Sequence, residues 1–332
     1  MSYGAQVKIG IARQAQTGSW ATVAGSYNPF AFLSSDVGAE FSEVISENLI
    51  SRFEQGASYQ GPQNVAGTLT FELTPRGIGT ALSAVVNHLP AVVTSGSVRT
   101  FTFLPTTSDY DTTMVKAPLS FYMQAADANS AELFYDVQAS QLQLSLAQGA
   151  LTRGSLTISG GTRLATGIGS LAIVPAASDV ARLFPWNVAS ISIGGSGAAN
   201  YSELSVTVND PMEALFAINN TLAPYKYARS GFREVTINGT LYFNDRAMLN
   251  AAAAGTLQRL LVTMINTRSA IQSGYYDMLQ LDIPQMLITD MKPNVSGPGE
   301  FSVSFTGRGT LDPTSNYAFQ ATLTNTFANS AY

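Results

Sequence analysis

The chain has 332 residues, enough for two domains, and only 12% are charged: 22 acidic and 17 basic side chains give a formal net charge of −5. It contains no cysteine, which excludes disulfides, thiolate chemistry and cysteine-based metal sites. No Lys/Arg run is present to bind phosphates, no apolar run approaches the roughly 18–20 residues that span a bilayer, and the N-terminus lacks the pattern of a secretory signal. We therefore expect a cytoplasmically made protein with no membrane partner.

The clearest element is a strand over Val65–Leu73, in which apolar residues alternate with threonine and glutamate. Side chains of a strand point to opposite faces with period two, so this pattern predicts one dry and one wet face. A long strand is expected before it, over Phe41–Phe53. Between them, Gln55–Asn64 contains two glycines and a proline and no hydrophobic periodicity, which predicts the loop of a long hairpin.

A helix is predicted directly after this strand. Thr74 supplies a capping hydroxyl and Pro75 suits the first helical position. Ile78, Leu82 and Val85 then form one apolar stripe that extends to about Asn87. Further strands are expected at Gln6–Ala12, Arg99–Leu104, Leu119–Gln124, Leu133–Ala139, Gln141–Leu146 and Leu151–Ser159.

The second half of the chain repeats features of the first. Gly67–Phe71 (Gly-Thr-Leu-Thr-Phe) recurs as Gly239–Phe243 (Gly-Thr-Leu-Tyr-Phe), and Leu156–Gly160 corresponds to Val303–Gly307. The glycine-rich stretch Ser159–Ser170 reads as a linker. We therefore predict a first domain over 1–160, a linker over 161–170 and a structural duplicate over 171–332.

Within the second half, a strand over Tyr201–Asn209 alternates cleanly, and the weakly patterned stretch Asp210–Arg233 occupies the place of the first hairpin loop. After the repeated strand, a helix is expected to open at Asp245 and run to Gly255. The remaining strands are predicted at Leu257–Ile265, Tyr275–Ile283, Met286–Met291 and Phe301–Phe305.

A search for catalytic or cofactor-binding residues gives weak signals. The single histidine, His88, follows a helix end and has no Gly-x-Ser-x-Gly elbow to accompany it, so a surface or capping role is favoured. Gly77–Leu82 lacks the third glycine of a dinucleotide loop, and Asp109 with Asp111 is more typical of a solvated turn than of a metal site. A pair of carboxylates that meet only in the fold stays open. We predict no enzyme activity and no cofactor.

The aromatic residues Tyr225, Tyr227 and Phe232 have two interpretations. With Arg229 and Arg233 between them they suit a stacking platform for nucleic acid, or a contact to a neighbouring protein, where Tyr and Arg are enriched. The absence of a wider basic surface favours the protein contact.

One combination of these elements resembles a known family. Glu43–Arg52 (Glu-Val-Ile-Ser-Glu-Asn-Leu-Ile-Ser-Arg), a Gly/Pro loop, Val65–Pro75 and a short amphipathic helix are similar to the tail tube proteins of long-tailed bacteriophages. The second half, with Gly231–Thr240 after its hairpin loop, is similar to the C-terminal domain of the duplicated branch of that family, which is typical of non-contractile siphovirus tails.

The resemblance implies a mainly β fold of two tandem β-sandwich or barrel-like domains, each with a flanking helix and a long hairpin. It implies a structural virion protein in the tail, assembled in the host bacterial cytoplasm. Three copies would form a pseudo-hexameric ring, and stacked rings a tube that conducts double-stranded DNA without binding it specifically. The partners implied are further copies, the tape measure protein, the tail terminator and distal tail or baseplate proteins. The alternatives are another tail component (terminator or baseplate hub) and a carbohydrate-binding β-sandwich.

Two sets of residues follow from this interpretation. The wet strand faces are expected to line the channel: Glu43, Glu47, Thr68, Thr70, Glu72, Glu203, Ser205, Thr207, Asn209, Thr240, Tyr242 and Asn244. Hydroxyls, amides and carboxylates offer phosphates no cation, so DNA would slide past them. The hairpin loops are expected to contact neighbouring rings or subunits: Gln55, Tyr59, Gln60, Pro62, Tyr225, Tyr227, Arg229, Phe232 and Arg233.

Overall fold

A computed structural model gives the fold of the chain. It describes residues 7–14, 18–22, 26–46, 58–86, 90–105, 116–125, 130–164, 168, 171, 173, 181–197, 200–218, 221–242, 246–294 and 301–327. Glu47, Asn244, Gln55, His88, Asp109 and Asp111, which the sequence analysis singled out, lie outside these residues.

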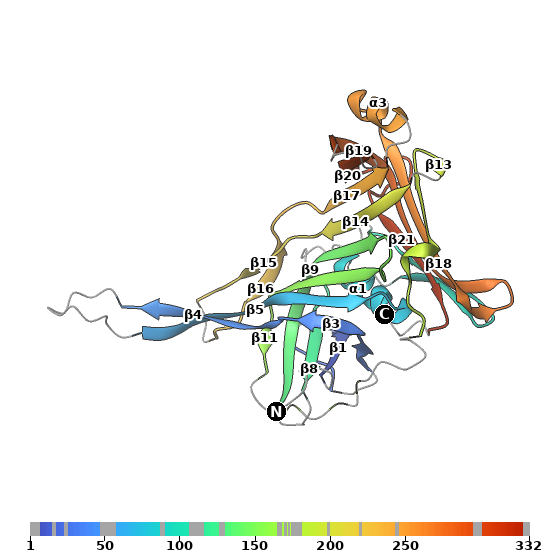
Figure 1. Cartoon of the computed structure of the whole chain (residues 1–332). Helices are drawn as coiled ribbons and strands as arrows, with labels where there is room; N and C mark the ends of the chain where they lie inside the picture. Colours follow the sequence, from blue (N-terminus) through green and yellow to red (C-terminus); the bar gives the residue numbers. More distant parts are fainter. Residues whose placement is uncertain are drawn as a thin grey trace.

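The described part of the first half contains one helix and a series of antiparallel strands (Figure 1). Its elements are β1 (Lys8–Arg13), β2 (Asn28–Pro29), β3 (Phe32–Ser35), β4 (Gly38–Ile45), β5 (Ser58–Glu72), α1 (Pro75–Val86), β6 (Ala91–Ser95), β7 (Val98–Phe103), β8 (Leu119–Gln124), β9 (Ala131–Ala147), β10 (Arg153–Ser159) and β11 (Thr162–Arg163).

The described part of the second half also contains one α-helix and a series of antiparallel strands, together with one short 3₁₀ turn, η5 (Trp186–Val188). Its elements are β12 (Ala189–Ile193), β13 (Ser196–Gly197), β14 (Tyr201–Asn209), β15 (Met212–Leu215), β16 (Lys226–Arg229), β17 (Glu234–Tyr242), α3 (Ala247–Ala253), β18 (Gln258–Gln272), β19 (Tyr275–Asn294), β20 (Ser302–Thr310) and β21 (Gln320–Asn325). The prediction of a mainly β protein is confirmed.

One continuous antiparallel sheet passes through both halves. Its strands follow the order β4–β5–β10–β9–β14–β17–β20–β19, and each neighbouring pair is joined by a backbone ladder. The two halves meet in the middle of this order, where β9 pairs with β14 from Gln141↔Asn209 to Ala147↔Glu203. Figure 1 shows these strands as one layer that runs from the blue arm to the orange strands.

The order of strands on the two sides of this junction is the same. The first half contributes β4–β5–β10–β9 and the second half β14–β17–β20–β19. The ladders also agree in register, since Gly67 lies opposite Ile158 and Gly239 opposite Phe305. Each glycine has a steric reason: a Cβ on Gly67 would meet the Val37 backbone at 2.5 Å, and one on Gly239 would meet the Phe305 ring at 2.5 Å.

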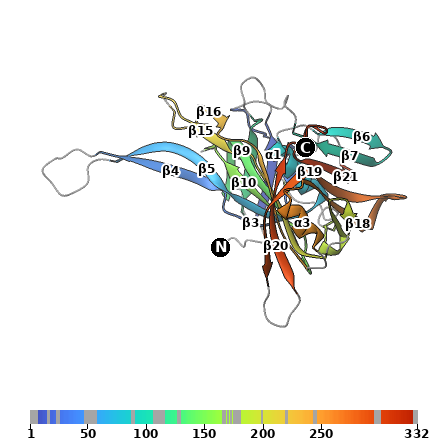
Figure 2. The ribbon, with the colours of Figure 1, turned by 90° about the horizontal axis from the view of Figure 1, so that it is seen from above.

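The predicted alternation produces a two-sided sheet. In β10, Leu156 and Ile158 are buried while Ser155 and Thr157 are half-exposed, and β5, β14 and β17 alternate in the same way. The buried face packs against α1 and against a second layer, in which β6, β7, β21, β19, β18 and β12 are paired in that order (Figure 2). The larger of the two hydrophobic clusters among the described residues therefore contains side chains from both halves.

Two predictions of paired short strands were wrong. Leu133–Ala139 and Gln141–Leu146 form one strand, β9, while Tyr275–Ile283 and Met286–Met291 form one strand, β19. Each long strand serves two sheet regions: β9 pairs first with β8 and then with β10 and β14, and β19 pairs first with β18 and β21 and then with β20. Register shifts lie within both strands, and such irregularities bend a strand without ending it.

The expected loop Gln55–Asn64 is also corrected, because β5 begins at Ser58. Residues 58–64 lack hydrophobic periodicity because they pair with β4 in an arm that projects from the body of the molecule, where neither face is covered (Figures 1 and 2). The β15–β16 hairpin lies beside the base of this arm, and the backbone N–H of Gln63 donates to the carbonyl of Leu222 at 2.9 Å.

The two described α-helices differ in burial. The helix α1 begins at Pro75 as predicted, with the Thr74 hydroxyl accepting a hydrogen bond from the Gly77 N–H at 3.1 Å. All of its residues except Arg76 are buried. The helix α3 begins at Ala247, two residues after the predicted start, and its described side chains are half-exposed or exposed.

Strand β10 offers a direct test of the two-sided sheet. Replacing the fully buried Leu156 by alanine should lower the free energy of unfolding by about 2–5 kcal/mol, because it leaves a cavity in the core. Replacing the adjacent Ser155 by alanine on the polar face should change it by less than about 0.5 kcal/mol. Urea unfolding of both variants measures the difference; equal losses would contradict the assignment of the faces.

Candidate functional site

The polar face of the main sheet is the largest continuous feature outside the core. Residues directly opposite one another on neighbouring strands share a face, so the ladder registers define rows of side chains. One row crosses seven strands and is polar throughout: Glu72, Arg153, Ser145, Ser205, Asn238, Thr306 and Asp290. The next row along the ladders is apolar or glycine and lies in or against the core: Phe71, Gly154, Leu144, Val206, Ile237, Gly307 and Ile288. It is one residue further along each strand except β19, where the register shift makes the step two residues.

The structure brings most of the predicted lining residues onto this polar face. They lie on β5, β14 and β17 and are half-exposed or exposed: Thr68, Thr70, Glu72, Glu203, Ser205, Thr207, Asn209, Thr240 and Tyr242. Glu43 is also exposed, but it lies on β4 in the projecting arm, after a register shift between Phe41 and Glu43. Its assignment to the same face stays a prediction.

The sequence analysis missed the share of this face that β9, β10 and β20 contribute. Gln143 and Ser145 on β9, Thr157 on β10, and Ser304 and Thr306 on β20 stand in register with the predicted residues. The alternation of Leu142, Leu144 and Leu146 with polar residues was the signal that could have found β9. Without the strand pairing, nothing indicated that β9 lies beside β14.

The polar face is not free of cations, contrary to the expected lining. Arg308 lies 2.6 Å from the Glu234 carboxylate, and Lys292 lies 2.6 Å from Asp290. The third cation, Arg153, stands opposite Glu72 in the ladder. The hydrogen bond to Asp290 also raises the pKa of Lys292. Each positive charge on the described part of this face thus has a carboxylate beside it, so there is no net basic surface.

The polar face is hollowed at the junction of the two halves. A depression of about 420 Å³ lies over β9, β14, β17, β20 and β19, with Gln143, Glu203, Asn238, Lys292 and Thr306 in its wall. The main sheet thus combines a hollowed polar face with a packed apolar face.

The predicted contact residues fall into two groups. Tyr59, Gln60, Pro62, Tyr225 and Phe232 are exposed on the two hairpins. Tyr227 and Arg233 instead contact the first half of the same chain, and Arg229 pairs with Asp210 beside them. The Tyr227 ring covers Gly160, where a Cβ would come within 2.2 Å of it, and its hydroxyl accepts a hydrogen bond from the Gly161 N–H.

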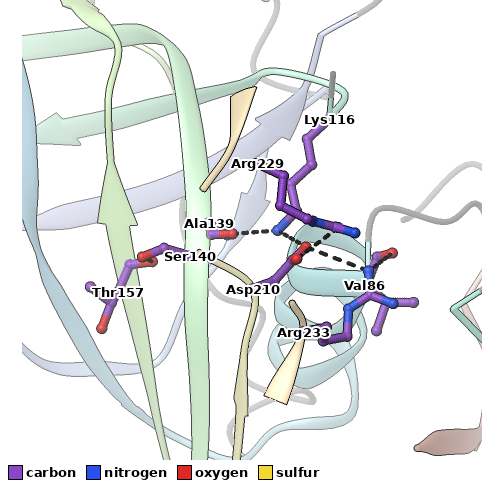
Figure 3. Close-up of polar contacts among 8 residues, drawn as sticks. All are labelled: Val86, Lys116, Ala139, Ser140, Thr157, Asp210, Arg229 and Arg233. Carbon is purple, nitrogen blue, oxygen red and sulfur yellow. Dashed lines mark hydrogen bonds and ion pairs between the residues drawn. The ribbon is translucent and has the colours of Figure 1, made fainter. Parts of the chain in front are cut away.

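A buried charge cluster holds the second half against the first (Figure 3). The Asp210 carboxylate, directly after β14, lies 2.7 Å from Lys116, 2.7 Å from Arg229 and 3.4 Å from Arg233. Two of these contacts join the halves: Asp210 pairs with Lys116 of the first half, and the Asp210 N–H donates to the Ser140 carbonyl at 2.7 Å. Lys116 is held in place by its own hydrogen bond to the Ala139 carbonyl at 2.8 Å.

Burial and charge oppose each other at Asp210. Burial alone would raise the pKa of this carboxyl, but Lys116, Arg233 and Arg229 together hold it below its ordinary value. Burial lowers the pKa of Lys116 to about 8, although Asp210 opposes this shift. One carboxylate thus faces three cations, and its removal would leave the buried Lys116 and the half-buried Arg229 and Arg233 without their shared countercharge.

Within the described residues, no group of three or more His, Cys, Asp or Glu side chains is placed to hold a metal ion. A helix long and apolar enough to cross a membrane is likewise not found in the part of the chain that the structure describes.

Among the described residues, the chain is mainly β, with one long polar face and two strands that pair on one side only, an arrangement typical of subunits of structural assemblies. Comparison with known families matches residues 4–309 to the family described as phage tail tube protein. The chain therefore belongs to the phage tail tube protein family and is a structural component of the virion tail. That membership favours a non-enzymatic role. No curated protein matches the chain.

Removing the central charge of the buried cluster should destabilise the protein. Asp210→Asn keeps the side-chain volume but leaves Lys116, Arg229 and Arg233 without their carboxylate, so we expect a loss of about 3–5 kcal/mol in the free energy of unfolding. Glu213→Gln, on the exposed side of β15, is the matched control and should be nearly neutral. Denaturant unfolding checks both; a neutral Asp210→Asn would disprove the role of the cluster.

The same cluster predicts a dependence on acid. Because the pKa of Asp210 is depressed in the folded state, its contribution to stability is complete above the ordinary value of 3.8 and is lost as the pH falls through the folded-state value. As the pH falls below about 4, the free energy of unfolding of the wild-type protein should therefore decrease more than that of Asp210→Asn. Parallel unfolding curves for the two proteins across this range would contradict the assignment.

Proposed function

We propose that this tail tube protein forms rings of three copies, that the rings stack, and that the polar face lines a channel through which double-stranded DNA passes. The single observation that carries the proposal is the main sheet: it is polar and hollowed on one face and packed on the other. Among the described residues, β4 at one end and residues 287–294 of β19 at the other pair with a strand on one side only. A barrel removes such edges by closing on itself.

Three copies, rather than six, follow from the repeat within the chain. We infer that residues 1–160 and 171–332 are copies of one tube domain joined by a linker at 161–170. The support is the identical strand order on the two sides of the β9–β14 junction and the matching registers at Gly67 and Gly239. A chain with two such units would form a pseudo-hexamer from three copies, each unit with a sandwich-like arrangement and a flanking helix.

Stacking is supported by the two ends of the sheet. The β4–β5 arm and the β15–β16 hairpin lie at the same end and expose apolar residues, among them Phe41, Tyr59 and Phe232. At the opposite end, a hollow of about 410 Å³ is lined by residues such as Trp186 and Tyr201. Unlike ends favour head-to-tail contacts, which build open stacks rather than closed pairs.

The partners in this proposal are further copies of the chain and, at the ends of the tube, a tail terminator and distal tail or baseplate proteins, with a tape measure protein inside during assembly. We place the assembly in the cytoplasm of the host bacterium and the finished tube in a non-contractile tail. Negative-stain microscopy of the purified protein at increasing concentration tests the ring and the tube. A protein that stays monomeric under all conditions would overturn the proposal.

The lining can be tested by adding charge to it. Thr207→Lys places an unpaired cation in the middle of the polar face, so assembled tubes should retain duplex DNA in low salt and release it as salt rises. Thr94→Lys on β6 adds the same charge away from this face and should leave DNA retention at the wild-type level. Co-sedimentation of tubes with labelled duplex measures the effect. Equal retention by the two variants would show that Thr207 does not face the channel.

A further inference from the structure

The chain contains its own example of how two tube units join. In the order of the main sheet, β9 is the last strand of the first unit, and it pairs with β14, the first strand of the second unit. The main sheet then ends with β4 on one side and β19 on the other, which hold the same places in the strand order as β14 and β9. Among the described residues, β4 pairs only with β5, and residues 287–294 of β19 pair only with β20.

We propose that β19 of one copy pairs antiparallel with β4 of a second copy in the register that β9 and β14 show within the chain. The inference rests on the ring proposed above and specifies its contact between copies.

The register follows from the two ladders. The first comparison is between β14 and β4. Thr207 on β14 pairs with Thr236, which lies three residues before Gly239. Glu40 on β4 pairs with Asn64, which lies three residues before the equivalent Gly67, so Glu40 corresponds to Thr207. The second comparison is between β9 and β19. Gln143 on β9 pairs with Ser155, which directly precedes Leu156. Asn294 on β19 pairs with Ser302, which directly precedes Val303, the equivalent of Leu156. Asn294 therefore corresponds to Gln143. Since Thr207 lies opposite Gln143, Glu40 of one copy lies opposite Asn294 of the next.

The proposed pairing of β19 with β4, called the seam below, agrees with the exposed fractions of the side chains concerned. Val208 and Leu142, which face each other at the internal junction, are 2% and 1% exposed. Their counterparts at the two free edges are Phe41, which is 55% exposed, and Pro293, which is also exposed. Both would be covered by the same contact.

The helices show the same contrast. The helix α1 packs beside β9 at the closed junction and is buried, whereas α3 packs beside β19 at the open edge and is half-exposed. The contact between copies therefore has apolar area to bury on both partners.

Charge also fits this register. On the polar face, Lys292 would stand diagonally across from Glu40, within reach of a long side chain. Pro293 has no N–H and contributes no donor, so the ladder between copies has one bond fewer than the internal ladder at that position. A proline is tolerated at a sheet edge and restricts the registers in which that edge can pair.

The absence of cysteine allows a direct test by disulfide trapping. Chains with Glu40→Cys are mixed with chains that carry Asn294→Cys, assembled and oxidised. Opposite residues of a ladder have Cβ atoms about 4.5–5.5 Å apart, close to what a disulfide needs. We expect a covalent dimer on a non-reducing gel that is lost on reduction. As a positive control, Gln143→Cys with Thr207→Cys in one chain should form the internal disulfide, seen by mass spectrometry.

Glu40→Cys mixed with Asp290→Cys is the register control, because Asp290 lies roughly 13 Å along the strand from Asn294. Dimers with Asp290→Cys in place of Asn294→Cys would overturn the register. If the mixed cysteine variants form rings or tubes in the microscope but no Glu40–Asn294 disulfide, while the internal control disulfide forms, the seam is wrong and the proposed ring still stands. Linked dimers from the Glu40→Cys and Asn294→Cys chains, together with a wild-type protein that never forms rings in the microscope, would support the pairing of β19 with β4 and reject the proposed tube.

Discussion

The backbone ladder between β9 and β14 is the contact on which the rest of the structure depends. It turns two four-stranded units into one sheet and places their polar sides on one face and their apolar sides over one core. Without it, each unit would present another bare strand edge, a row of unpaired N–H and C=O groups. The ladder is reinforced on its buried side by Asp210, whose position directly after β14 lets one carboxylate bind cations from both halves.

The two faces of the sheet have different physical tasks. The buried face is held by apolar side chains whose removal from water supplies stability, and it tolerates little change in volume. The polar face is composed of hydroxyls, amides and balanced charges, which need no defined partner in a solvated channel. Arg153, Arg308 and Lys292 show that a lining can contain cations and still present no net basic surface, because each lies beside a carboxylate. This face thus has no net basic surface because its cations lie beside carboxylates, and not because cations are absent.

A bent strand shared by two layers is the second constraint on the architecture. Both β9 and β19 leave one group of strands and enter the main sheet, and each contains a register shift. This sharing links the main sheet covalently to the strands outside it. It also explains why the larger hydrophobic cluster contains residues of both halves.

Much of the fold could be read from local patterns. The alternation in Val65–Leu73 and Tyr201–Asn209 defined strands with one wet face, the Thr74-Pro75 pair defined the start of α1, and the repeat of Gly67–Phe71 at Gly239–Phe243 indicated related halves. These features depend on the period of a strand or on a cap, which involve residues close in sequence. The family resemblance drew on the same local signals, and the family match agrees with it.

The sequence by itself thus determined the class of fold, the existence of a polar face on individual strands and the family. Only the tertiary structure decided that β9 lies beside β14, that β9 and β19 are single bent strands, and that Tyr227 and Arg233 contact the first half of the chain. Those outcomes depend on pairings between residues far apart in the chain. Backbone groups are the same at every position, so strand partners are chosen by the packing of the whole core and not by any local pattern.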